Sequence, residues 1–143
     1  AQADVAVFGE KDYQQLLVIR QMARDLDIPT EIYGAPTLRE IDGLALSSRN
    51  VYLSESERAR APALHQALDA ASRAIARGAA IEEMMAQARS AVTAAGFEID
   101  YIEARDAQTL APVTDGAAGA LRILAAARLG ATRLIDNVAV AAT

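Results

Sequence analysis

The chain has 143 residues, and 14 Lys and Arg against 19 Asp and Glu give it a net charge of −5. This length predicts one domain or slightly more, and the acidic balance argues against nucleic-acid binding. No cysteine is present, so disulfides, thiolate nucleophiles and cysteine-based metal sites are excluded. No apolar run reaches the roughly 18 residues that a membrane-spanning helix needs.

The first part of the chain has the pattern of an α/β unit. A short apolar run at residues 4–8 predicts a buried strand. Residues 13–26 carry apolar side chains at helical spacing, and a second strand is expected at residues 30–34. Together they predict one parallel βαβ unit. Residues 37–50 are polar and irregular, which is typical of a loop.

The rest of the chain predicts a small α+β module. A helix is expected to begin at Ser54, because Glu57 completes a capping box. Pro62 lies within its early turns, so either the first turn is distorted or the regular helix starts nearer Arg60. A second helix is expected at residues 81–95. The strands that follow, the last two forming an antiparallel hairpin, are expected at residues 97–104, 121–128 and 132–140.

The start of the chain is unusual. It has neither an initiating Met nor a signal-peptide pattern. A single strand-helix-strand unit also cannot cover both faces of its own sheet. Both observations lead to the expectation that the chain is part of a longer protein.

The first candidate site follows the first predicted strand and consists of Gly9, Glu10, Lys11 and Asp12. In open parallel sheets, ligands bind beyond the carboxyl ends of the strands, where helix N-termini offer N–H groups to anions. Gly9 allows close backbone approach, and Lys11 supplies a cation for a phosphate. The alternative is an ordinary loop in which Asp12 caps the helix, and so short a pattern leaves it open.

The second candidate site is the run Leu46-Ser47-Ser48-Arg49 in the polar loop. Two hydroxyls and a guanidinium side by side suit the oxygens of a phosphate. A turn with an exposed arginine is the alternative. Taken together, the two loops predict an anion site near one edge of the sheet.

Other candidates have simpler interpretations. His65, the single histidine, falls on the exposed or boundary side of a predicted helix, so a structural role is expected. Met22 matches the apolar face of its helix and is expected in a core. Arg39 and Glu40 are expected to be solvated surface charges.

Two long motifs, at residues 8–16 and 39–53, resemble the pantothenate synthetase (pantoate–β-alanine ligase) family, and residues 126–137 are similar to its C-terminal strands. The resemblance covers nearly the whole chain but only the C-terminal half of the family's length. It implies an α/β plus α+β fold. Residues 1–50 would be the C-terminal part of a Rossmann-like nucleotidyltransferase domain, and residues 51–143 a small domain of helices packed on an antiparallel sheet.

The resemblance implies an ATP-dependent ligase. Such an enzyme joins pantoate to β-alanine through pantoyl adenylate and gives pantothenate, AMP and pyrophosphate. Mg²⁺ would arrive bound to ATP, with no metal ligand from the protein. The full-length protein would be a cytoplasmic homodimer that acts on small molecules, without nucleic-acid or membrane partners.

The resemblance also implies roles for individual residues. Gln15 would bind pantoate, and the backbone of Leu38 would meet the adenine. Four residues would act in catalysis by stabilising charge on the phosphates: Lys11, Ser47, Ser48 and Arg49. The ATP-binding set would be Gly9, Glu10, Lys11, Asp12, Leu38, Leu46, Ser47, Ser48 and Arg49.

The family's His-x-Gly-His motif and its other pantoate-binding glutamine belong to the N-terminal half and have no match in this sequence. We therefore expect the chain by itself to make no pantothenate. Two other hypotheses stay open: a non-catalytic module that mediates domain or subunit contacts, and another adenylate-forming nucleotidyltransferase with a different acid substrate.

Overall fold

The computed structural model describes residues 3–113 and 119–141. They form two compact units, Ala1–Leu38 and Arg39–Thr143. The units divide after Leu38, whereas the expected domain boundary lies after Asn50. The physical reason is that residues 39–50 bond to the second unit, above all through an ion pair between Arg39 and Asp136.

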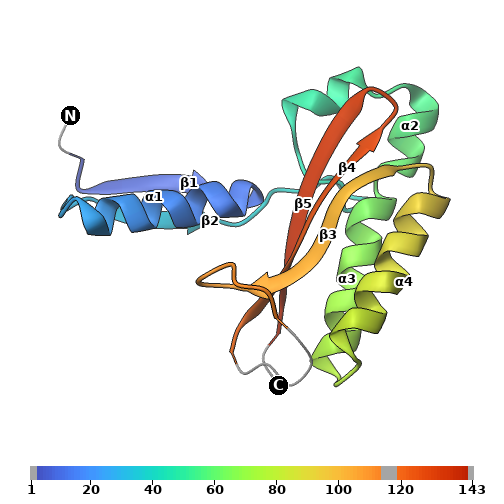
Figure 1. The fold of residues 1–143 in the computed structure, drawn as a ribbon. Helices are drawn as coiled ribbons and strands as arrows, with labels where there is room; N and C mark the ends of the chain where they lie inside the picture. The colour runs from blue at the N-terminus through green and yellow to red at the C-terminus, as the bar shows by residue number, and fades with distance from the viewer. Residues whose placement is uncertain (1–2, 114–118, 142–143) are drawn as a thin grey trace. The chain divides into compact units, whose positions relative to one another are not determined.

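The first unit is a strand-helix-strand arrangement (Figure 1). Its strands are parallel, with Val7 opposite Tyr33, so the expected βαβ unit is confirmed. Met22 is 46% exposed, which corrects the expectation of a core position. One helix and two strands bury only the side chains between them, such as Leu16. The elements are β1 (Val5–Gly9), the 3-10 turn η1 (Glu10–Asp12), α1 (Tyr13–Asp25) and β2 (Glu31–Ala35).

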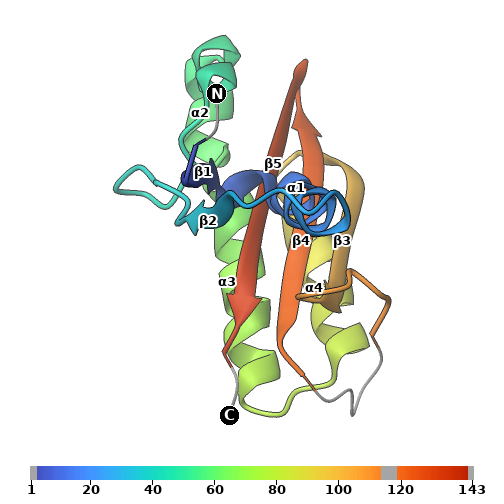
Figure 2. The same cartoon turned by 90° about the vertical axis from the view of Figure 1, so that its left-hand side faces the viewer.

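The second unit is an antiparallel sheet in the order β3-β4-β5, with α3 and α4 side by side along one face (Figures 1 and 2). The expected hairpin is confirmed, with its turn at Gly130. The elements are η2 (Ser48–Tyr52), α2 (Glu55–Arg60), α3 (Ala63–Ala76), α4 (Ile81–Ala94), β3 (Glu98–Asp106), β4 (Leu121–Leu129) and β5 (Thr132–Val140).

The helix expected from Ser54 onward is two helices. Ser54 accepts the Glu57 N–H, and the Glu57 carboxylate accepts the Ser54 N–H, so the capping box is confirmed. The first helix ends before Pro62, and α3 starts directly after it. Proline lacks the N–H that would continue the helical ladder, but it is well placed immediately before a new helix.

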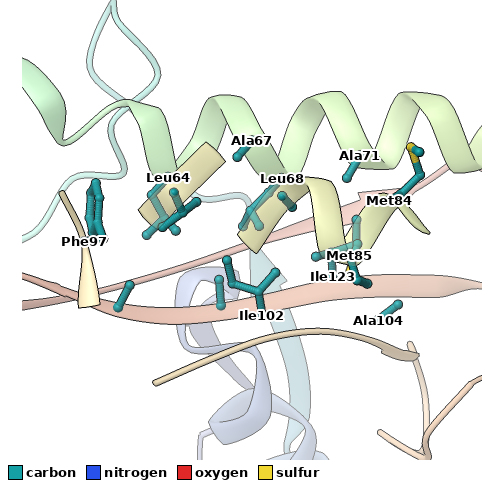
Figure 3. Close-up of a cluster of buried hydrophobic side chains, with 14 of the residues drawn as sticks. Leu64, Ala67, Leu68, Ala71, Met84, Met85, Phe97, Ile102, Ala104 and Ile123 are labelled. Atoms are coloured by element: carbon teal, nitrogen blue, oxygen red, sulfur yellow. The ribbon is translucent and has the colours of Figure 1, made fainter. Parts of the chain in front are cut away.

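The core of the second unit lies between the two long helices and the sheet (Figure 3). Small alanines such as Ala67 and Ala71 face the partner helix and permit close approach. Within the described residues, no helix is both long enough and apolar enough to cross a membrane. Completely or almost completely buried members of the core include Leu64, Leu68, Val92, Ile102 and Ile123.

Candidate functional site

The first candidate loop connects β1 to α1 within the first unit. Gly9 ends the strand, and a Cβ built on it would meet no described atom within 4 Å. Glu10, Lys11 and Asp12 form η1. Asp12 occupies the N-cap position of α1 but makes no side-chain cap hydrogen bond, so the capping role that the alternative interpretation gave it is wrong. Only η1 separates the carboxyl end of β1 from the start of α1, and helix N-termini in such positions can bind anions.

Close packing of the sheet holds this loop. A Cβ at Gly34 of β2 would lie 2.9 Å from a methyl of Leu16 and 3.0 Å from a carboxylate oxygen of Glu10. Glycine at this position lets both side chains approach the strand. Gln15 lies in the first turn of α1 and is exposed between the buried Tyr13 and Leu16. Its amide is thus at the same end of the helix as η1.

The second candidate loop belongs to the second unit. The Ser47 hydroxyl accepts the Arg49 N–H at 3.2 Å, and the Ser47 carbonyl accepts the Asn50 N–H at 3.1 Å. These bonds fold the segment into η2 and leave the Ser48 and Arg49 side chains exposed, beside a half-exposed Leu46. Among the described residues, none forms an ion pair with Arg49. A hydroxyl and a guanidinium are therefore presented together to solvent.

A buried carboxylate holds the base of this loop. Asp136 of β5 is only 4% exposed, and its two oxygens accept the Arg39 guanidinium at 2.7 and 2.8 Å. His65 places its Nδ1 3.3 Å from the same carboxylate. Burial raises the pKa of Asp136, but the His65 imidazole and the Arg39 hydrogen bonds and charge lower that pKa more, so the carboxyl titrates below its ordinary 3.8. The expectation that Arg39 is a solvated surface charge is wrong.

The turn whose carbonyl accepts a hydrogen bond from Arg39 contains Gly43. Its φ of +94° is a conformation that side chains rarely adopt, and its carbonyl accepts a hydrogen bond from Arg39 at 3.1 Å. Beside it, Asp42 accepts the Arg58 guanidinium at 2.6 Å and the Leu44 N–H at 3.2 Å. The Arg58 hydrogen bond holds the pKa of Asp42 below its ordinary range. Side chains from α2 and β5 thus both contact the loop.

Gly43→Ala should destabilise the second unit by about 2–4 kcal/mol, because strain at positive φ adds to overpacking. A Cβ at this position would lie 2.8 Å from the Cδ2 of His65. Gly78→Ala is the matched control, since its φ is +92° but no described atom lies within 4 Å of the added Cβ. That variant should lose only about 1 kcal/mol, from backbone strain alone. Urea unfolding measures both losses, and equal losses would contradict the packing of Gly43 on His65.

The structure brings the expected site residues together in two groups. Gly9 to Asp12 and Gln15 lie at one end of the first unit, and Leu46 to Arg49 lie in the second unit. Leu38 is exposed at the last position of the first unit. Within the described ranges, no cluster of three or more His, Asp or Glu side chains could hold a metal ion.

A family profile described as Pantoate-beta-alanine ligase matches residues 1–139. The chain belongs to this family. It is 61% identical to the pantothenate synthetase of Caulobacter vibrioides over 143 residues, which covers 98% of this chain and 50% of the relative. For the pantothenate synthetase of Bradyrhizobium sp. BTAi1 the identity is 56% over 137 residues, covering 96% of this chain and 48% of the relative. The chain thus spans about half the length of the curated relatives it matches.

Solved structures of the family are similar to this one. Pantothenate synthetase from Thermus thermophilus matches with a TM-score of 0.91 and 48% identity, over 97% of this chain and 50% of that one. Pantoate-beta-alanine ligase from Francisella tularensis, solved in complex with Beta-gamma ATP and β-alanine, matches with a TM-score of 0.64 and 30% identity, over 96% and 44%. These matches confirm the resemblance and an α/β fold.

Proposed function

We propose that this chain supplies the phosphate-binding loops of a ligase that joins pantoate to β-alanine at the expense of ATP. The observation that carries the proposal is the family match across residues 1–139. The Francisella tularensis relative, solved with Beta-gamma ATP and β-alanine, supports these two ligands for the present chain. The exposed Ser48 hydroxyl and Arg49 guanidinium can donate hydrogen bonds to the oxygens of a triphosphate.

The proposed reaction has two steps. The carboxylate of pantoate attacks the α-phosphorus of ATP, so the bond to the β-phosphate oxygen breaks and pyrophosphate leaves. The amine of β-alanine then attacks the carbonyl carbon of pantoyl adenylate, loses a proton and expels AMP, which gives pantothenate. The substrate carboxylate is the nucleophile in the first step, so the protein's task is to position groups and stabilise charge.

In this proposal, the cations act on the phosphates. Lys11 binds phosphate oxygens at the start of α1, and Arg49 binds the triphosphate with the hydroxyls of Ser47 and Ser48. Negative charge grows on the pyrophosphate as it leaves, so these fixed groups stabilise the transition state more than the ground state. Mg²⁺ enters with ATP and neutralises part of the phosphate charge.

The other expected contacts are part of the same proposal. Gln15 binds pantoate from the first turn of α1. The backbone at Gly9 stays open for close approach of the nucleotide, as the free space beside it permits. The remaining ATP contacts are Glu10, Asp12, Leu38 and Leu46.

The domain type, the oligomeric state and the location of the whole protein are proposals too. The parallel β1–β2 pair joined by α1 supports assignment of the first unit to the end of a Rossmann-like domain. The homodimer and the cytoplasmic location rest on the family alone. The inactivity of the chain by itself remains a prediction, and pantoate-dependent release of AMP would contradict it.

Lys11 is the only lysine in the chain, so amine acetylation reports on it directly. ATP with Mg²⁺, at ten times its dissociation constant, should slow acetylation of Lys11 by about tenfold, because bound nucleotide covers the amine. Mass spectrometry of tryptic peptides measures the rate, and the N-terminal amine of the same molecule serves as the internal control. Equal acetylation of Lys11 with and without ATP would contradict its role.

A further inference from the structure

We propose that Asp136 is a positioning residue, which together with Arg39 and His65 fixes the phosphate loop onto β5 and α3 within the second unit. The phosphate loop is defined here as residues 40–53. That this loop binds phosphate rests on the function proposed above. Its anchoring rests only on contacts within the second unit.

Arg39 joins β5 to the phosphate loop. Its guanidinium donates to both oxygens of Asp136, and it also reaches the Asn137 carbonyl at 3.4 Å. The same side chain donates to the Gly43 carbonyl at the tip of the turn, at 3.1 Å. One planar fork therefore binds β5 and the loop at once, and a guanidinium is suited to this geometry because its donors are fixed in one plane.

His65 of α3 contacts the same carboxylate and the same turn. His65 lies against both the Asp136 carboxylate, at 3.3 Å, and the Cα side of Gly43. Asp136 is thus enclosed by groups from β5, from α3 and from Arg39, the residue directly before the loop. An almost fully buried carboxylate is costly unless it is compensated, so these partners are required for the fold to retain it.

A short, hydrogen-bonded segment connects this cluster to the residues proposed to bind phosphate. Arg39 forms a β-bridge with Ala45, and the Glu40 N–H donates to the Leu44 carbonyl at 2.8 Å. Leu44 and Ala45 are both buried, and Ser47 follows two residues later. Farther on, η2 packs against β5, the strand that carries Asp136. The exposed Ser48 and Arg49 therefore project from a base that is fixed on both sides.

The function of such a base is preorganisation. A loop that is already held in the binding geometry loses less conformational entropy when it closes on phosphate. Small displacements of positioned groups also lower rates strongly. Asp136 touches no substrate in this account and acts through the loop that it holds.

The test compares Asp136→Asn with Asp69→Asn. Asp69 pairs with Arg73 on the surface of α3 at 2.8 Å and serves as the matched control, since its substitution removes an ion pair away from the loop. Hydrogen exchange by mass spectrometry follows the loop amides that donate within the unit, those of Gly43, Leu44, Asn50 and Leu53. In Asp136→Asn, exchange of these amides should rise at least about tenfold while β4 amides stay protected. Asp69→Asn should change neither.

The outcomes separate the anchoring from the function of the loop. A local rise in exchange with a parallel loss of ATP–Mg²⁺ affinity, measured by calorimetry, supports both. A local rise in a chain whose wild type binds no ATP supports the anchoring and contradicts the proposed function. Unchanged loop exchange overturns the anchoring, and a rise that leaves ATP affinity unchanged overturns the positioning role.

A second variant keeps the test decisive if Asp136→Asn exchanges at every amide. Arg39→Lys retains the positive charge beside Asp136 but loses the two-pronged hydrogen bond. A rise in exchange confined to the loop would support the proposal. Protection of the loop equal to that of the wild type would overturn it.

Discussion

Ile123→Ala is expected to lower the free energy of unfolding of the second unit by about 2–5 kcal/mol, the cost of a truncated core side chain. Ile123 is fully buried in β4, at the centre of the core that α3 and α4 close (Figure 3). Removal of its branched side chain loses buried apolar surface and leaves a cavity that the surrounding strands cannot fill completely.

Ile41→Ala is the matched control for that loss. Ile41 is fully exposed in the same unit, so the same chemical change should alter the free energy of unfolding by no more than about 0.5 kcal/mol. Urea unfolding followed by circular dichroism measures both variants. Equal losses of unfolding free energy in the two variants would contradict the statement that the second unit folds around its own core. They would also contradict the fixed base assigned to the phosphate loop.

Arg49→Ala is expected to weaken binding of ATP–Mg²⁺ by about 10- to 100-fold, the value of a charge-assisted hydrogen bond to phosphate. The guanidinium is exposed, so the effect should be largest at low ionic strength, where salt screens it least. Arg49→Lys should fall between the wild type and the alanine variant, because an ammonium keeps the charge but not the fork.

Arg77→Ala is the control for charge alone. Arg77 is exposed at the end of α3 in the same unit, and its substitution removes the same formal charge from a place outside the phosphate loop. Isothermal calorimetry should show wild-type affinity for this variant. A similar loss in both alanine variants would mean that the binding depends on the overall charge of the chain and not on the loop.

Local patterns predicted most of the secondary structure. The capping box at Ser54 and the hairpin turn at Gly130 depend on residues close together in the sequence, and both are confirmed. At Pro62, however, one expected helix is two. Met22 is exposed because exposure depends on what packs beside its helix, which no local pattern shows.

The anchor of the phosphate loop was not found from the sequence, because its members are far apart in the chain. Arg39 and Asp136 are separated by 97 positions, and no local pattern links them. A signal was nevertheless present in β5. Asp136 shares one buried face of β5 with Thr132 and Leu134, and a carboxylate at such a position requires a cationic partner.

The expected site residues form two compact motifs in the sequence, and their roles stay a prediction. Each motif falls on a loop that the structure folds tightly, at η1 in the first unit and η2 in the second. Their joint action on one triphosphate remains a proposal. Binding measurements therefore test it more directly than any local feature.

The most direct test of that claim is calorimetric titration of the unmodified chain with ATP–Mg²⁺ and with adenosine. We expect saturable binding of ATP at one site, competition by inorganic tripolyphosphate, and an affinity for adenosine at least about tenfold weaker, because the loops recognise phosphate. Equal affinities for ATP and adenosine, or ATP binding that tripolyphosphate leaves unchanged, would contradict it.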